Sequence, residues 1–337
     1  MKTPARLFGD RRAPVEVQET AGFPSINYTF RMASILTRGQ IVGYAALCAI
    51  WGSTWLAIRL VVQDMPPLRA AAIRFLAAAV LLLGLAAAQR RSWPRRKSQW
   101  NALLVLSLTI MAVPYGLLFW AEQYVTSSMT AVLFSAMPLL VAFFTPLMMH
   151  KTVPRRAVFA LLVAFGGLLM LFSSGLSASG RAVLGGVAVL AAVVLSAWSV
   201  VYAKDRLQHI DAVISTALQL LFGSVALFWA TWAMESHRQA VWTRTAVLAM
   251  AFLVVFGSCA AFVIYYWLLK RMQPYQLSTI SLITPIIAVL EGALLLHEPV
   301  PLLMVVAIAV VLGAVATVLL SRPEPNGDRG KVLLVQE

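Results

Sequence analysis

The residues of this sequence that are best suited to recognising a ligand form two copies of an aromatic–aromatic–arginine stripe. Both copies keep a four-residue spacing: Trp51, Trp55 and Arg59 in the first, and Trp198, Tyr202 and Arg206 in the second. In a helix, residues at this spacing lie on one face. Such a face offers aromatic surface and a cation to a passing small molecule. Aromatic stripes also pack in protein interiors, so the spacing alone leaves pathway and packing both open.

Two ionisable residues, Glu291 and Arg74, lie inside long apolar stretches. A charge in such a position is costly unless it is paired or hydrated. Gly292 follows Glu291 and permits another helix to approach closely. We expect Glu291 to face the protein interior, either as the partner of Arg74 or as a protonatable group; the alternative is a carboxylate that reaches the lipid headgroups. For Arg74 we favour a structural ion pair over substrate contact.

The stretches that carry these residues are long enough to cross a bilayer. The chain has 337 residues, 61% hydrophobic and 12% charged, whereas soluble domains carry about 25% charged residues. A spanning helix needs about 20 apolar residues, and only helices or closed barrels satisfy their backbone in lipid. The sequence therefore predicts an all-α membrane protein with ten transmembrane helices: 41–62, 68–88, 100–121, 126–149, 157–173, 183–203, 212–234, 246–268, 275–296 and 300–320.

The net charge of +14 follows the expected topology. The two tails and alternate links between spans hold 21 Lys and Arg residues, and the other links hold four. This is the positive-inside pattern, which predicts cytoplasmic N- and C-termini in a multi-pass protein of the bacterial inner (plasma) membrane. It also accounts for the basic charge without nucleic acid. Residues 1–39 read as a disordered cytoplasmic tail, and residues 321–337 as a second tail.

Enzyme chemistry has little support in the motifs. Cys48 and Cys259 both fall inside spans and offer neither a disulfide framework nor a metal spacing. The chain has no phosphate-binding loop of the GxxxxGK[ST] type and no HExxH. We expect no catalytic residue, no metal and no cofactor.

The chain is internally repeated at an offset of 147 residues. At this offset Trp51 meets Trp198, and Pro138 meets Pro285. The offset predicts two five-helix repeats, residues 40–173 and 183–320. Because five is odd, the second repeat enters the membrane from the opposite side, which is the inverted architecture of secondary transporters. Prolines within spans predict kinks that are either static or act as hinges, at Pro114, Pro138 and Pro285.

Several segments resemble the EamA-type members of the drug/metabolite transporter superfamily. They are IWGSTWLAIRL, IRFLAAAVLLL, EQYVTSSMTAVLFSAMPLLVAF and TPIIAVLEGALLLHEPV. The resemblance implies ten helices in two halves and movement of a small metabolite, often outward. We expect a secondary transporter for an amino-acid-like compound or a drug-like amphiphile, working by alternating access in the bilayer. A homodimer is left open, and the alternative function is a membrane-embedded transferase acting on a lipid-linked substrate.

Overall fold

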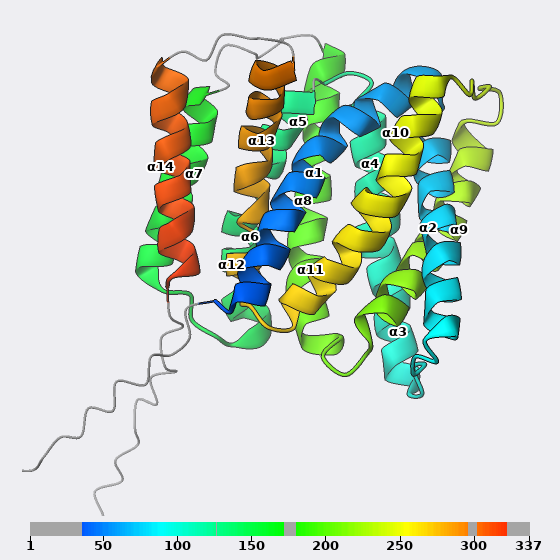
Figure 1. Ribbon diagram of the computed structural model, residues 1–337, viewed down its shortest axis with the longest axis horizontal. Helices are drawn as coiled ribbons and strands as arrows, with labels where there is room; N and C mark the ends of the chain where they lie inside the picture. The colour runs from blue at the N-terminus through cyan, green and yellow to red at the C-terminus, as the bar shows by residue number, and fades with distance from the viewer. Residues whose placement is uncertain (1–35, 126, 172–179, 296–301, 322–337) are drawn as a thin grey trace, which may run out of the picture. The chain divides into compact units, whose positions relative to one another are not determined.

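The computed structural model describes residues 36–125, 127–171, 180–295 and 302–321, and every regular element in these ranges is a helix (Figure 1). The predicted tails fall almost wholly outside the described residues. The α-helices are α1 (Arg38–Asp64), α2 (Pro67–Ala88), α3 (Lys97–Leu106), α4 (Val113–Ala121), α5 (Ser127–Phe134), α6 (Met137–Met149), α7 (Arg155–Leu171), α8 (Gly180–Arg206), α9 (Ala212–Met234), α10 (Arg244–Val254), α11 (Ala261–Leu269), α12 (Pro274–Leu277), α13 (Ile280–Leu295) and α14 (Leu302–Leu319).

Seven helical stretches in the described part of the chain are long and apolar enough to cross a membrane. They are Arg38–Asp64, Pro67–Ala88, Lys97–Ala121, Met129–Met149, Gly180–Arg206, Ala212–Met234 and Arg244–Leu269. The other three spans expected from the sequence coincide with the shorter helices α7, α13 and α14. The prediction of an all-α membrane protein is confirmed.

Helices α2 and α9 pack along each other, and polar groups tie both ends of the pair. At one end, Arg91 forms an ion pair of 2.7 Å with Asp211, which directly precedes α9. At the other end, the Glu235 carboxylate accepts the backbone N–H groups of Leu68 and Arg69, each at 3.0 Å. These amides at the start of α2 lack intrahelical partners, so the distant carboxylate caps the helix. The two helices therefore run antiparallel.

The third helix of each half contains a turn of π-helix. Segment η1 (Ser107–Ala112) separates α3 from α4, and η3 (Val255–Ala260) separates α10 from α11. Val255 lies one residue beyond the position expected from the 147-residue offset of Ser107. Such turns commonly occur at functional sites, because they rotate the side chains that follow. The matching interruptions show that the repeat extends to local backbone geometry.

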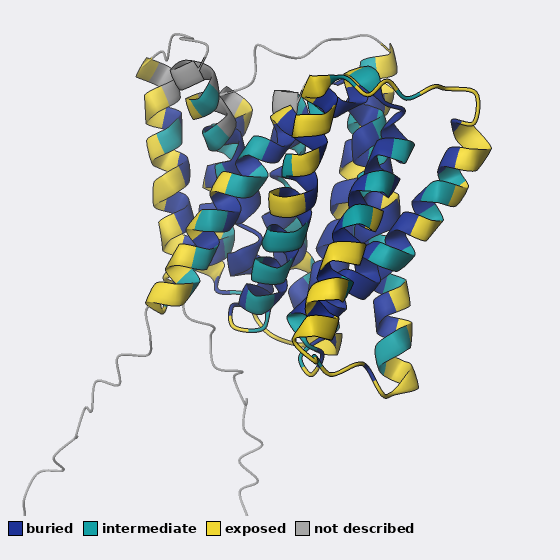
Figure 2. Ribbon diagram, turned by 45° about the vertical axis from the view of Figure 1, so that its right-hand side comes forward, coloured by how far each residue is buried: buried dark blue, intermediate teal, exposed yellow. Residues whose placement is uncertain are grey.

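Exposed residues lie on the outward faces of the helices (Figure 2), and many of them are apolar. Phe159, Trp232 and Leu248 are each 70% exposed or more, and many other large apolar residues lie on the outer faces. An outer surface of this kind is what a bilayer requires of a membrane protein. Inside, α1 and α13 approach so closely that a Cβ atom added at Gly52 would lie 2.5 Å from Ile287.

Candidate functional site

A cavity with an empty volume of about 770 Å³ lies inside the bundle, among helices from both halves. This volume includes space that is open to solvent. Trp51 and Ser196, which lie near the middles of α1 and α8, place the cavity at half the length of these helices. It is lined by Trp51, Thr54, Trp55, Ile58, Ile110, Tyr115, Leu118, Phe134, Met137, Ser196, Phe262, Tyr265, Leu277, Ser278, Ile280, Ser281 and Thr284.

Among these lining residues, the sequence predicted only Trp51 and Trp55 as pathway candidates. The 147-residue repeat relates several of the others to one another. Four pairs of lining residues are separated by the same 147 positions as the stripes. The pairs are Tyr115 with Phe262, Leu118 with Tyr265, Phe134 with Ser281, and Met137 with Thr284. The third and fourth helices of each half thus contribute equivalent positions to one cavity.

The aromatic members of the lining contact one another and form a continuous wall. The Trp51 ring lies 5.7 Å from Phe262 and 5.2 Å from Tyr265, measured between ring centroids. Trp55 packs edge-on against Phe134 at 5.8 Å. These are the edge-on and tilted geometries that aromatic pairs prefer. The first stripe therefore both packs and lines the cavity.

The polar groups of the cavity fall into two kinds. The hydroxyls of Thr54, Ser278, Ser281 and Thr284 each donate to the carbonyl oxygen three residues earlier, at 2.7 to 3.3 Å. In contrast, Trp51 Nε1, Trp55 Nε1 and Tyr265 Oη are buried and have no hydrogen-bond partner within the described part of the chain. A buried polar group without a partner is uncommon and calls for an explanation.

The second stripe does not reach the cavity. Trp198 stacks on Tyr202 at 5.0 Å, and the Arg206 guanidinium lies over the Tyr202 ring at 5.7 Å. The cavity residue that α8 supplies is Ser196, which lies two residues before Trp198 and therefore on a different face of the helix. Arg206 also contacts the neighbouring Asp205 at 3.0 Å, with both side chains more than half exposed. The two stripes, which the sequence predicted as equivalent pathway candidates, therefore do not line the cavity together in this structure.

Arg59 and Arg74, the other expected cations, are held within the protein. Arg59 Nη1 donates to the backbone oxygen of Glu122 at the end of α4. Arg74 is 1% exposed and donates to Ser258 Oγ at 2.8 Å and to the Gly257 oxygen at 3.0 Å. Its guanidinium carbon lies 5.4 Å from the Tyr115 ring centroid. Cation–π contact and hydrogen bonds thus surround a buried charge.

Glu291 does not pair with Arg74. Its carboxylate accepts a hydrogen bond from Ser53 Oγ on α1, and the described partners of Arg74 are the neutral groups of η3. Similar depth along two spans suggested the pair, but depth does not fix the direction in which a helix presents a side chain. Glu291 instead joins α13 to α1, close to the tight contact at Gly52.

The three prolines occupy different positions in their helices. Pro114 lies at the start of α4, directly after the π-helical turn η1. Pro138 lies at the start of α6, where Ser135 and Ala136 interrupt the fourth span. Pro285 lies inside α13. Two of the three expected kink sites therefore coincide with breaks in helical structure.

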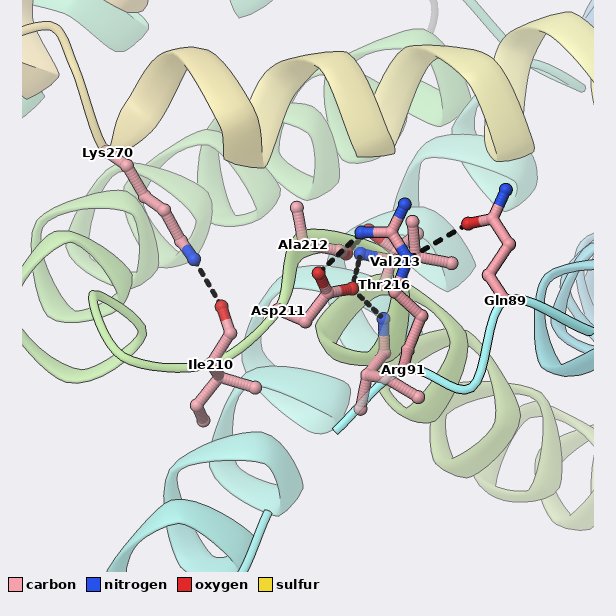
Figure 3. A network of polar contacts seen from close by, with 9 residues as sticks. Gln89, Arg91, Ile210, Asp211, Ala212, Val213, Thr216 and Lys270 are labelled. Atoms are coloured by element: carbon pink, nitrogen blue, oxygen red, sulfur yellow. Dashed lines mark hydrogen bonds and ion pairs between the residues drawn. The ribbon is translucent and has the colours of Figure 1, made fainter. Parts of the chain in front are cut away.

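A polar network joins three links at the ends of α2, α9 and α11 (Figure 3). Asp211 accepts from the backbone N–H groups of Val213 and Ile214 and from Arg91, and Lys270 Nζ donates to the Ile210 oxygen. Burial raises the pKa of Asp211, but the Arg91 side chain and the two amides outweigh burial and hold the pKa below its ordinary value. Burial lowers the pKa of Lys270.

The chain is similar in sequence to membrane transporters. The model of a family described as the EamA-like transporter family matches residues 39–173 and again residues 183–320. An uncharacterized transporter of Bacillus subtilis, YoaV, is 28% identical over 81% of this chain and 92% of its own length. An uncharacterized inner membrane transporter of Escherichia coli, YedA, is 31% identical over 82% of this chain and 89% of its own.

A solved crystal structure shares the fold. It superposes with a TM-score of 0.67, at 18% sequence identity, over 83% of this chain and 96% of the solved chain. The relatives are named as transporters, and none of these comparisons supports the alternative of a membrane-embedded transferase.

Proposed function

Because this chain belongs to the EamA-like transporter family, we propose that it carries a small organic molecule across the bacterial inner membrane by alternating access. The observation that carries the proposal is the central cavity, to which equivalent positions of both halves contribute. In secondary transporters a single site at the interface of two repeats is reached from each side in turn. The cavity is where we place the substrate.

Ten spans in two inverted repeats are the architecture that this mechanism uses. The antiparallel pairing of α2 with α9, the second spans of their halves, supports inversion. The π-helical turns in the third spans support the correspondence between halves. We assign residues 40–173 and 183–320 to the two repeats, close to the two stretches that the family model matches.

The distribution of Lys and Arg supports cytoplasmic termini. In that orientation the network around Asp211 lies at the cytoplasmic face. Single cysteines at exposed link positions test the orientation: a membrane-impermeant maleimide added to whole cells should label His237→Cys and leave Ser98→Cys unlabelled until the cells are opened. Labelling in the reverse pattern would refute it.

The cavity suits an amphipathic substrate, such as an amino-acid-like compound or a drug-like amphiphile. At the equivalent positions of the repeat, the first half supplies Leu118, Phe134 and Met137, whereas the second half supplies Tyr265, Ser281 and Thr284. Three of the four equivalent pairs are therefore apolar in the first half and hydroxyl-bearing in the second, whereas the pair Tyr115 and Phe262 has its hydroxyl in the first half. We propose export as the direction, in keeping with the family resemblance.

Glu291 is our candidate for the coupling group. Within the described residues its partner is the neutral Ser53 hydroxyl on α1, and a carboxylate in this position can exchange a proton as α1 and α13 separate and rejoin. Pro285 lies one and a half turns before it in α13 and offers a hinge for that separation. Transport by Glu291→Gln should lose its dependence on pH while the protein remains at its normal level in the membrane.

A resistance screen tests the proposed function. Cells that produce the protein, or its Trp55→Ala variant, are grown with toxic amino-acid analogues and amphiphilic drugs. We expect cells with the unaltered protein to tolerate at least one compound better than cells with the Trp55→Ala variant. The same compound should leave proteoliposomes that contain the unaltered protein. Absence of any differential tolerance, together with absence of flux from proteoliposomes, would contradict the proposal.

A further inference from the structure

Three polar hydrogens at the cavity lack an acceptor within the described residues. They belong to Trp51 Nε1, Trp55 Nε1 and Tyr265 Oη, and all three of these atoms are buried. Trp55 and Tyr265 are 8% and 3% exposed, and all three residues that carry these donors line the cavity. A buried donor without an acceptor is costly, and a ligand oxygen placed within reach removes that cost. The site is therefore built to receive a hydrogen-bond acceptor.

The described lining of the cavity contains no carboxylate that could pair with a cationic ligand. None of the described residues that line the cavity carries a formal charge. Glu291 is engaged by Ser53 outside the lining, and Glu122, one turn after Leu118, also lies outside it. An ammonium group that entered the cavity would leave water without gaining an ionic partner, which is strongly unfavourable at an apolar site.

The charge that approaches the cavity wall is positive. The Arg74 guanidinium carbon lies 5.4 Å from the ring of Tyr115, and that ring lines the cavity. Ser258 and Gly257 accept hydrogen bonds from Arg74, both are neutral, and Nη1 has no partner in the described part of the chain. A buried cation that is not neutralised by a carboxylate raises the potential around it and favours an anion nearby.

From this arrangement we infer that the cavity selects a small organic monoanion, a carboxylate on an apolar body, over the corresponding amine. The inference rests on the transport function proposed above, and it narrows the substrate class to compounds without an ammonium group. The carboxylate accepts from Trp51, Trp55 and Tyr265, and the apolar body packs against the side of Leu118, Phe134 and Met137.

Four probes with one phenyl body and different head groups test this inference. They are hydrocinnamate, the neutral hydrocinnamide, zwitterionic phenylalanine and cationic phenylpropylamine. Binding to the detergent-solubilised full chain is measured by titration calorimetry. We expect hydrocinnamate to bind tightest, with affinity about tenfold above that of phenylpropylamine. Equal or tighter binding of phenylpropylamine or phenylalanine, or equal affinity for all four, would overturn the inference.

Two tyrosines on α11 provide a matched pair of variants. Tyr265→Phe removes the unpartnered hydroxyl and should lower hydrocinnamate affinity by about tenfold without loss of thermal stability, because no protein bond is broken. Tyr266→Phe removes a hydroxyl that donates to Gln219 at 2.6 Å outside the cavity, and should leave the probe preference unchanged. An unchanged affinity in Tyr265→Phe would overturn the assigned contact.

Flux of each labelled probe in proteoliposomes separates this inference from the function on which it rests. Preferential binding of hydrocinnamate without flux of any probe would contradict transport and leave the charge preference standing. Flux of phenylpropylamine in preference to hydrocinnamate would leave transport standing and overturn the charge preference.

Discussion

The two aromatic stripes have the same spacing and different surroundings. Trp51 and Trp55 line the cavity, where their N–H groups have no partner in the described part of the chain. Trp198 and Tyr202 stack on each other outside the cavity, and the exposed Arg206 lies over the Tyr202 ring. The third and fourth helices behave in the opposite way, because their equivalent residues line one cavity in pairs. A repeat thus preserves helix position more faithfully than it preserves the role of a side chain.

This asymmetry is also chemical. At three of the four equivalent pairs in the cavity, the residue is apolar in the first half and hydroxyl-bearing in the second, as in the change from Phe134 to Ser281. A symmetric cavity would offer the same surface twice and could not orient an amphipathic ligand. Divergence between the halves therefore gives the cavity apolar and hydroxyl-bearing regions that can orient an amphipathic ligand.

The largest expected difference between the halves is in transport. Trp51→Ala should lower the transport rate by about tenfold or more, because it removes an aromatic wall and a free donor from the cavity. Trp198→Ala, outside the cavity, should remain within about twofold of the unaltered protein. Both are measured as initial rates in proteoliposomes, normalised to reconstituted protein. Equal losses in the two variants would make the stripes functionally equivalent after all.

A smaller effect is expected at the next pair of equivalent positions, Gly52 and Ser199. Gly52→Ala should destabilise the protein by about 1–3 kcal/mol, because the new methyl group would overlap Ile287. Ser199→Ala removes a hydroxyl bonded to Thr109 and should cost about 1 kcal/mol. Thermal unfolding in detergent provides the measurement. The overlap involves the Cβ atom of Ile287, so the loss caused by Gly52→Ala should be smaller in an Ile287→Gly background than in the unaltered protein. An equal loss in the two backgrounds would refute the steric cause.

The smallest effect concerns the equivalent carboxylates Asp64 and Asp211. Asp211→Asn should lower the free energy of unfolding by about 1 kcal/mol at neutral pH, because the Asp211 carboxylate caps α9 and forms an ion pair with Arg91. Its folded pKa lies below the unfolded value of about 3.9. The stabilisation is therefore complete above that value and is lost as pH falls through the folded pKa.

The thermal unfolding midpoints of the unaltered protein and of Asp211→Asn, measured in detergent, should therefore converge as pH falls below about 4. Asp64→Asn is the control, since its carboxylate accepts from the Thr243 side chain and does not cap its own following helix. A gap between the unaltered protein and Asp211→Asn that stays constant with pH would show that the charge of Asp211 contributes nothing.

Much of this arrangement was predictable from the sequence for a physical reason. Lipid forces spanning segments to be apolar helices, so hydropathy located the helices, and the 147-residue offset related the halves. Scarce residues such as Pro138 and Pro285 revealed the offset. Applied to the third and fourth helices, the same offset would also have identified Tyr115, Phe262 and Tyr265 as candidates.

The direction in which each helix presents its residues was not predictable. Arg74 and Glu291 lie at similar depths, but packing turns them to different neighbours, Ser258 and Ser53. The π-helical turns η1 and η3 add a further rotation that a regular helical period does not contain. Side-chain roles in the cavity therefore depended on tertiary packing rather than on spacing.

The pairing of α7 with α14 has a consequence for how the chain is made. The two helices pack against each other, and a Cβ atom added at Gly167 would meet Val311 at an ordinary contact distance of 3.4 Å. A ribosome that adds about 5–20 residues per second needs on the order of ten seconds to pass from α7 to the end of α14. During that interval α7 lacks its partner, and lipid or a membrane chaperone must cover its face. Assembly of the transporter therefore finishes only when translation does.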